Sequence, residues 1–210
     1  MLRDIRKQYN FGTLNENDVL QNPFEQFKIW LHEAILKEQP EPTVMVLSTV
    51  DEHLQPHSRV VLLKELTDEG FIFYTNYEGN KVNQMARNNH VSLLFFWQTV
   101  ERQVRITGVA EKSDEKAAEE YFKSRPIESQ LGAWASPQSR IIENHEVLEQ
   151  RFEEFKNKFG NNIPKPPHWG GYLVRPLTFE FWQGRPNRLH DRLYFSKDEN
   201  ETWKIDRLAP

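Results

Sequence analysis

The sequence predicts an α+β fold, mainly antiparallel β, in which the strands form a barrel and the helices lie at its margins. Most of the chain after residue 42 consists of short segments with alternating apolar side chains, the period of a strand. Short turns such as Thr67-Asp-Glu-Gly70 join many of these segments, whereas parallel strands need long crossover connections. The few segments with helical spacing interrupt the strands instead of alternating with them, which favours the antiparallel arrangement.

The N-terminal part of the chain predicts an arm followed by a helix. Residues 1–21 are polar and lack periodicity, so we expect a flexible arm before a single domain over residues 22–210. A helix is expected to begin at Asn22-Pro23, because Asn suits the N-cap and Pro the first turn, and to end by Pro40. Its apolar face comprises Phe24, Phe27, Leu31 and Ile35.

The remaining elements follow from the change in period along the chain. The predicted strands are Thr43–Val50, Ser58–Leu66, Gly70–Asn76, Val91–Trp97, Arg102–Lys112, Trp169–Arg175, Thr178–Gln183, Arg192–Ser196 and Trp203–Leu208. Three further helices are predicted over Gly79–Asn88, Ser113–Ser124 and Asn144–Phe159. The phenylalanines of the last helix are expected to make core or dimer contacts.

Composition and charge exclude several classes of function. A net charge of −4 argues against a broad binding surface for nucleic acid or membranes, so local basic clusters must bind any anion. The absence of cysteine excludes disulfides and a cysteine nucleophile. No apolar run approaches the length of a membrane span and no signal segment is evident, so we expect a soluble cytoplasmic protein. We expect no metal site, since Pro56 lies between His53 and His57 and argues against a helical pair of ligands. No Gly-rich P-loop or dinucleotide fingerprint occurs, which argues against a nicotinamide or nucleotide-triphosphate enzyme.

The most informative segment runs from Phe179 to Arg192. It follows an alternating aromatic strand, FEFWQ, with three arginines and a histidine within eight residues. So dense a group of cations and donors suits a phosphorylated or anionic ligand. Within it, Arg188 and His190 are alternate residues of what we expect to be an extended segment, and they should therefore face the same side.

The spacing from FEFWQ to RLHDR, together with the closing WKIDRLAP, resembles the C-terminal signature of the pyridoxamine (pyridoxine) 5′-phosphate oxidases. The resemblance covers nearly the whole chain after the arm. It implies a split β-barrel that binds FMN and forms a homodimer. It further implies oxidation of pyridoxamine 5′-phosphate and pyridoxine 5′-phosphate to pyridoxal 5′-phosphate, with dioxygen as the electron acceptor and hydrogen peroxide as a product.

The resemblance also implies a set of FMN contacts. Arg59 and Lys64 are five apart and would face opposite sides of one strand, with Arg59 at the flavin phosphate and Lys64 towards the substrate phosphate. Gln138-Ser139 would be contributed across the dimer. Asn80 and Arg140 depart from many relatives, which have arginine and serine there. The implied cofactor residues are Arg59, Val60, Val61, Leu62, Leu63, Lys64, Tyr74, Thr75, Asn80, Lys81, Gln103, Gln138, Ser139, Trp182 and Arg192.

The implied substrate residues come from three further segments. Lys64, Tyr121, Arg125 and Ser129 would bind the substrate phosphate, although Pro126 makes their convergence on one helical turn uncertain. Arg188, Leu189 and His190 would lie over the pyridine ring, with Arg188 and His190 as the catalytic pair. Arg6 and Tyr9 would belong to an arm that closes on bound substrate.

Other functions remain open from the sequence. One alternative is a split-barrel flavin reductase, and another is a non-catalytic pyridoxal-phosphate carrier that has kept the pocket but lost flavin turnover. Peroxide formation on addition of pyridoxamine phosphate would distinguish them. A nucleic-acid-binding barrel would need a basic face, which the overall charge does not indicate.

Overall fold

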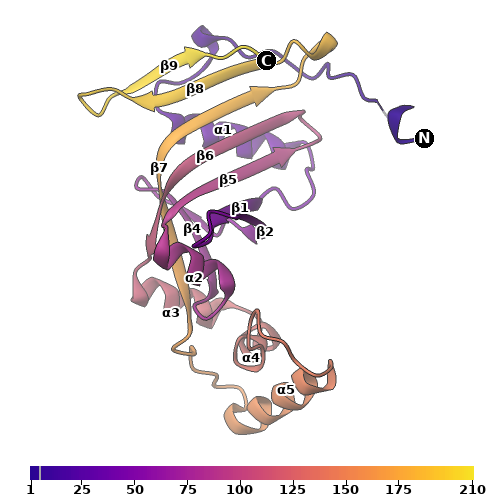
Figure 1. Ribbon diagram of the computed structural model, residues 1–210, viewed down its shortest axis with the longest axis vertical. Coiled ribbons are helices and arrows are strands. Elements are labelled where there is room, and N and C mark those ends of the chain that lie inside the picture. Colours follow the sequence, from indigo (N-terminus) through magenta and orange to yellow (C-terminus); the bar gives the residue numbers. More distant parts are fainter. Residues whose placement is uncertain (5) are drawn as a thin grey trace.

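Within residues 1–4 and 6–210, which the computed structural model describes, the strands form one nine-stranded antiparallel sheet (Figure 1). Its main path runs β2-β1-β5-β6-β7-β4-β3, and β8 and β9 extend it beside β7. The strands are β1 Val44–Val50, β2 Pro56–Leu62, β3 Glu65–Leu66, β4 Phe71–Asn76, β5 His90–Trp97, β6 Arg102–Lys112, β7 Trp169–Gln183, β8 Asp191–Lys197 and β9 Trp203–Arg207. The predicted antiparallel α+β class is therefore confirmed.

The longest strand, β7, differs from the prediction of two separate strands. It pairs with β6 from Tyr172 to Gln183, and the register shifts between Thr107 and Gly108. Gly108 faces Pro176 and Thr107 faces Thr178, so Leu177 is the extra residue of a bulge. On its other edge, β7 pairs first with β4 and then with β8. The bulge lets one strand continue past Pro176, which has no N–H to donate.

The predicted strand Ser58–Leu66 is also different in the structure. Pairing with β1 ends at Leu62, and Leu63 N then donates to the carbonyl of Thr43 while Lys64 N donates to that of Ile72. Leu63 is buried in the core. The chain therefore changes partner strand between Leu62 and Glu65, and the expectation that Arg59 and Lys64 share one strand is wrong.

Helix α1 (Pro23–Leu36) packs on the sheet (Figure 1) and adds Phe27 and Trp30 to an aromatic core that the strands mainly supply. The Asn22 side chain accepts from Phe24 N at 2.9 Å, which confirms the predicted N-cap. The Phe27 ring lies 4.9 Å from both Phe71 and Phe95. Ile35 is half exposed, because Trp30 and Ala34 take the inner positions at that end of the helix.

Four more helices lie at one end of the sheet: α2 (Asn80–Arg87), α3 (Glu115–Ser124), α4 (Ile127–Ala135) and α5 (Glu146–Phe159). Helix α4 was not predicted. It packs beside α5, and the pair lies at the end of the molecule farthest from β8 and β9 (Figure 1). A second apolar cluster is centred on Phe122, Leu131, Ile163 and Trp169. Within the described part of the chain, no helix is long and apolar enough to cross a bilayer.

The N-terminal segment is packed on the domain from about residue 9. Leu14 and Val19 belong to the main apolar core, and Leu14 N donates to the Asp191 carboxylate at 3.0 Å. The boundary expected after residue 21 therefore does not mark a change in packing. Alternation of polar and apolar residues could not indicate this, because the segment reaches the core through two isolated side chains.

Candidate active site

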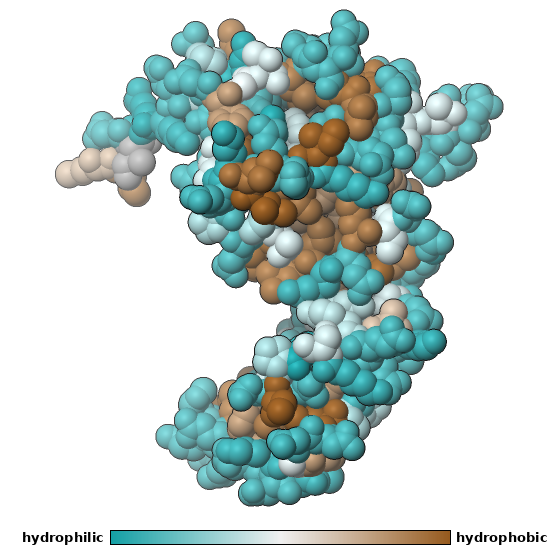
Figure 2. Space-filling model, turned by 180° about the vertical axis from the view of Figure 1, so that it is seen from behind, coloured by the Kyte–Doolittle hydropathy of each residue, from teal (hydrophilic) through white to brown (hydrophobic). Residues whose placement is uncertain are grey.

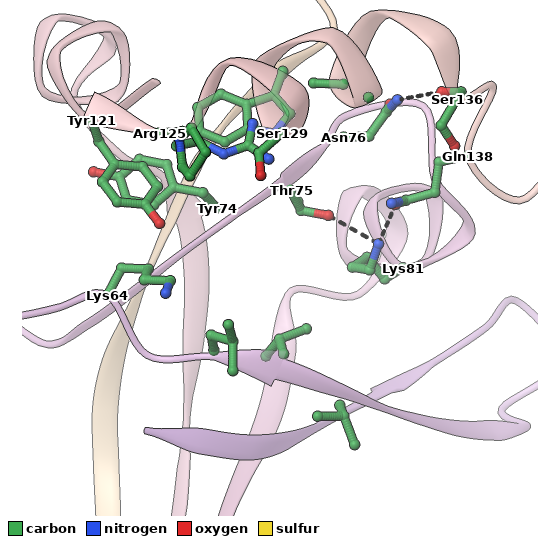
Figure 3. A pocket seen from close by; sticks show the side chains of 17 residues that line it. Lys64, Tyr74, Thr75, Asn76, Lys81, Tyr121, Arg125, Ser129, Ser136 and Gln138 are labelled. Carbon is green, nitrogen blue, oxygen red and sulfur yellow. Dashed lines mark hydrogen bonds between the residues drawn. The ribbon is translucent and has the colours of Figure 1, made fainter. Parts of the chain in front are cut away.

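A pocket of about 670 Å³ lies between β2, the ends of β4 and β7, and helices α2, α3 and α4 (Figure 3). Residues from both predicted sets line it. From the cofactor set come Val60, Val61, Leu62, Tyr74, Thr75, Lys81 and Gln138. From the substrate set come Lys64, Tyr121, Arg125 and Ser129. Segments that are distant in sequence are therefore brought to one cavity.

At one end of this pocket, Lys81 projects from the first turn of α2 (Figure 3). Its Nζ donates to Thr75 Oγ1 at 2.9 Å and to Gln138 Oε1 at 2.5 Å. Burial, together with the nearby charge of Arg59, lowers the pKa of Lys81 to about 8. Both partners are neutral, so the ammonium group has no counter-ion among the residues that the structure describes. Such a cation is suited to a bound anion.

The loop after α4 meets the start of α2. The Asn80 N–H donates to Ser139 Oγ at 3.3 Å, and Asn76 Nδ2 donates to the Ser136 carbonyl at 3.5 Å. Gln138 and Ser139 therefore lie beside Lys81 of the same subunit, which corrects the expectation that they reach the site across a dimer. The N-cap residue of α2 is Gly79, which has no side chain to cap the helix, and Ser139 Oγ accepts from the Asn80 N–H in its place.

The opposite end of the pocket is formed by the turn between α3 and α4. Helix α3 ends at Ser124 and Pro126 is the N-cap of α4, so the chain changes direction between them. Tyr121, Arg125 and Ser129 converge because they lie on two helices joined at this turn (Figure 3). Lys64 faces them from the strand side.

Arg125 is the most unusual side chain of the pocket. Its guanidinium carbon lies 4.9 Å from the Trp169 ring centre and 5.5 Å from that of Phe122. Its Nη1 is buried and has no hydrogen-bond partner among the described residues. Burial lowers the pKa of Arg125, although the group stays protonated at neutral pH. An unpaired buried donor is costly, so this one is suited to an anionic ligand.

Three aromatic rings line the wall next to Arg125. The Tyr74 ring lies 4.2 Å from that of Tyr121 and 5.3 Å from that of Trp169, and both pairs are stacked. The Tyr74 hydroxyl donates to Glu65 at 2.6 Å. Sequence reasoning placed Trp169 only at the start of a strand. It comes two residues after the Pro-rich connection that ends at Pro167, and no local pattern marks it as a pocket residue.

A separate group of predicted residues lies near the far end of β7. The His190 and Trp182 rings are 4.7 Å apart, and Gln103 is paired opposite Trp182. Arg192 is bound to Glu180 and to the Ala209 carbonyl. Trp169 and Trp182 are thirteen positions apart on one strand, a path of about 40 Å. Within one subunit, this group therefore cannot touch a ligand in the pocket.

The segment that contains Arg188 and His190 is not extended, contrary to prediction. Residues Pro186–Arg188 form a single 3₁₀ turn, and Asn187 and Arg188 have positive φ values of 56° and 63°. His190 Nδ1 accepts from Arg185 N at 3.1 Å. Burial and the charge of Arg188 lower the pKa of His190. At neutral pH the imidazole is therefore neutral and its proton lies on Nε2.

Comparison with known proteins identifies the family. Residues 31–159 match the family model described as pyridoxamine 5′-phosphate oxidase. Residues 169–210 match the pyridoxine 5′-phosphate oxidase C-terminal dimerisation region. The chain belongs to the pyridoxamine 5′-phosphate oxidase family. Pyridoxine/pyridoxamine 5′-phosphate oxidases from Burkholderia thailandensis and Cupriavidus necator are each 50% identical to it, over 100% of this chain and 99% of theirs.

Solved structures of this family share the fold. PhzG from Burkholderia lata 383, determined with tetrahydrophenazine-1-carboxylic acid, has a TM-score of 0.88 and 28% identity, over 94% of this chain and 98% of that one. An FMN-binding protein from Nostoc punctiforme, related to pyridoxamine 5′-phosphate oxidase, has a TM-score of 0.69 at 14% identity, over 88% and 97% of the two chains. The predicted split-barrel fold is confirmed by these neighbours.

Two cations implied by the family resemblance lie outside the pocket. Arg59 donates to the Leu47 carbonyl, to Thr49 Oγ1 at 2.7 Å and to Gln84 Oε1 at 3.0 Å, so its guanidinium is already occupied. Arg6 donates to the carbonyl of Arg3 and is exposed. Leu189 is exposed near the far end of β7. The structure thus brings the phosphate-binding candidates together with the exception of Arg59, and separates the ring-binding ones from them.

Proposed function

We propose that this chain is an FMN-dependent oxidase that converts pyridoxamine 5′-phosphate and pyridoxine 5′-phosphate to pyridoxal 5′-phosphate. Dioxygen would be the electron acceptor and hydrogen peroxide the second product. The observation that carries the proposal is the presence of two cationic subsites in one pocket. Lys81 lies at one end and Arg125 at the other, and neither forms an ion pair with a residue that the structure describes. The phosphate of the cofactor would supply an anion to Lys81, and the phosphate of the substrate would supply one to Arg125.

The pocket residues fit FMN. Lys81, Thr75 and the start of α2 offer a cation, a hydroxyl and the positive end of a helix dipole to a phosphate. Val60, Val61 and Leu62 provide an apolar wall for a flat ring. When bound, FMN supplies a two-electron acceptor that dioxygen can reoxidise. The protein residues would fix the orientation of the ring and of the substrate against it.

Arg125, Tyr121, Ser129 and Lys64 would bind the substrate phosphate. The Arg125 guanidinium is planar and held against two rings, so it can present two N–H groups to phosphate oxygens. Binding would give its orphan Nη1 an acceptor. Tyr121 and Ser129 would contribute hydroxyl donors, and Lys64 a second charge from the strand side (Figure 3).

The C-terminal group would reach this pocket from a second copy of the chain. Trp182, Arg188, His190 and Arg192 lie at the opposite end of β7 from the pocket, so one subunit cannot supply both halves of a site. The match of residues 169–210 to a dimerisation region supports a homodimer. Exposed apolar side chains of the sheet, among them Val60 and Phe96, offer an interface. Figure 2 shows a broad apolar area on one face of the molecule.

In such a site, Arg188 and His190 would act on the substrate ring. A neutral His190 donates from Nε2, because its Nδ1 accepts from Arg185 N. It would therefore orient an oxygen or nitrogen of the substrate by donating a hydrogen bond. Arg188 would stabilise negative charge on the hydroxyl oxygen or the ring of the substrate, whose exocyclic carbon at ring position four gives up a hydride to the cofactor; in the alcohol substrate the hydroxyl proton would pass to water. Imine hydrolysis would then complete the reaction of the amine substrate.

The purified protein tests the proposal directly. We expect a flavin absorption spectrum, release of free FMN on denaturation, and steady peroxide formation with either phosphorylated substrate under air. A flavin reductase would consume a reduced nicotinamide and ignore pyridoxine phosphate. A carrier would bind pyridoxal phosphate without producing peroxide. Turnover of unphosphorylated pyridoxine at the same efficiency would contradict the assignment of the Arg125 subsite.

A further inference from the structure

Glu101 has a buried carboxylate that is directed at the N-terminal segment. The residue lies in the turn between β5 and β6, in a left-handed conformation with φ of 51°, and is only 6% exposed. Its Oε2 accepts from Asn10 N at 2.6 Å and from Phe11 N at 2.9 Å. Its Oε1 lies 3.1 Å from Lys7 Nζ. One carboxylate thus binds three donors of a segment about ninety residues away in sequence.

These contacts lie next to Tyr9. The Tyr9 ring packs edge-on against Trp182 at 5.6 Å and against His190 at 5.8 Å. A Cβ on Gly184 would lie 2.6 Å from Tyr9 Cγ, so the ring can occupy this position only because residue 184 is glycine. Gly184 N donates to the Glu101 carbonyl at 2.8 Å. Glu101 therefore binds both the segment that carries Tyr9 and the backbone on which Tyr9 rests.

We propose that Glu101 is a positioning residue, whose carboxylate holds residues 7–11 so that Tyr9 stays against Trp182 and His190. The inference rests on the proposed function, because it assumes that these two rings belong to the substrate site. Two backbone N–H groups bound to a buried carboxylate fix the direction of the chain on either side of Tyr9. Without that carboxylate the contact of Lys7 is lost as well, so of these contacts only Tyr9 packing remains and the segment opens more often.

The first measurement needs no substrate. Amide hydrogen exchange of peptides covering residues 8–14 reports how often Asn10 N and Phe11 N are released. In Glu101→Ala we expect exchange there to rise at least about tenfold, the factor for a lost hydrogen bond to a charged group. Glu101→Gln should rescue most of the protection, since an amide oxygen can still accept. Lys7→Ala should have little effect, because Lys7 is half exposed.

The second measurement is steady-state oxidation of pyridoxine 5′-phosphate. If the closed segment is the binding-competent state, KM rises by the factor by which the closed fraction falls, so a variant whose segment is closed about a tenth of the time has a KM raised about tenfold with kcat nearly unchanged. Flavin content should stay at the wild-type level. Glu101→Gly removes the carboxylate but relieves the positive φ, so it serves where the alanine variant folds poorly.

Each outcome decides one part of the proposal. Full protection of residues 8–14 in both Glu101→Ala and Glu101→Gly would show that the carboxylate does not hold the segment. Exchange at the rate of an unfolded peptide, which means that the segment is mostly open, with an unchanged KM would show that the position of Tyr9 does not matter for substrate. A wild-type protein that oxidises neither phosphorylated substrate would overturn the proposed function, and with it the role of Glu101 in substrate binding. The exchange data for the Glu101 variants would still decide whether Glu101 holds the segment.

Discussion

Lys81 shows at the scale of one residue how burial prepares a ligand site. Its ammonium group is bound only to neutral oxygens, and burial and Arg59 lower its pKa to about 8. The protonated form is therefore less stable in the empty protein than in water, although it still predominates at neutral pH, and a bound phosphate would stabilise it. The buried Nη1 of Arg125 likewise lacks a hydrogen-bond partner in the empty protein and would gain one from a bound phosphate.

We expect the affinity for FMN to fall as pH rises through about 8, because only protonated Lys81 attracts the phosphate. The contribution of Lys81 to the stability of the apoprotein has the opposite sign. Its folded pKa lies below its unfolded value, so between the two the unfolded chain binds the extra proton and the free energy of unfolding rises with pH. Fluorescence titrations of FMN across this range, beside urea unfolding of the apoprotein, measure both trends.

Two variants serve as controls for Lys81. Lys81→Arg keeps the charge at all these pH values, so its FMN affinity should lose this pH dependence. Lys81→Ala should weaken FMN binding by about 1.5–3 kcal/mol at neutral pH, the range for a hydrogen bond to a charged group. An affinity in Lys81→Ala equal to that of the wild type would remove Lys81 from the cofactor site.

Arg125→Ala should raise KM for both phosphorylated substrates and leave FMN affinity almost unchanged, because the two cationic subsites lie at opposite ends of the pocket. Trp169→Leu should have a smaller effect of the same kind, since it removes the ring against which the guanidinium packs. Trp169→Phe should recover part of the loss. Steady-state kinetics with pyridoxine as the unphosphorylated control tests this, and equal losses for pyridoxine would contradict it.

At the scale of elements, the strands were the most predictable part of the fold. The alternation from Arg102 to Lys112 predicted β6 to the residue, and Asn22-Pro23 gave the start of α1. Helix α4 escaped prediction because it follows Pro126 directly and is short, and few of its residues are buried. The break after Leu62 was missed because Leu63 continues the apolar pattern while its backbone changes partner.

The site was less predictable than the fold, for a physical reason. Lys81 meets Gln138 across 57 positions, and Tyr121 reaches Ser129 only through the bend at Pro126. Such contacts depend on tertiary geometry, which local periodicity does not contain. The family resemblance supplied these residues, whereas local patterns placed Arg188 and His190 wrongly on an extended segment. Asn187 and Arg188 instead turn the chain with positive φ.

This turn should be sensitive to the residue at position 187. Asn187→Val places a β-branched side chain in the left-handed region, at a cost of about 1–2 kcal/mol, so we expect the turn to rearrange. Because Arg188 and His190 follow directly, kcat should fall more than tenfold, while Asn187→Gly should remain close to wild type. Single-turnover flavin reduction is the measurement. Equal rates in the valine and glycine variants would show that the turn does not position the pair.

At the scale of the whole molecule, the separation of the two half-sites is the main constraint. The pocket lies near Trp169 and the C-terminal group near Trp182, about 40 Å apart along β7. A symmetric dimer can bring the pocket of one copy to the C-terminal group of the other, twice. The exposed apolar residues of the sheet would become buried in the same step.

Subunit complementation tests this arrangement. Arg125→Ala and Arg188→Ala should each be nearly inactive with limiting substrate. Mixed dimers contain one site in which both residues are intact only if the two come from different subunits. Co-expression of both variants should then recover about a quarter of wild-type activity, since half of random dimers are mixed and each has one intact site. No recovery in isolated mixed dimers would place both residues of a site in the same subunit.

The continuity of β7 has a mechanical consequence. A neighbouring strand supports it along its length, since β4 pairs with Trp169–Val174 and β6 pairs with it from Tyr172 to Gln183 on either side of the bulge at Leu177. Removing one residue from a paired stretch would turn every later side chain to the opposite face. Removing two would restore the faces but shorten the strand by about 7 Å, and symmetry would repeat the error in the second site. In the proposed dimer, the number of residues in β7 therefore sets the distance between the pocket and the C-terminal group.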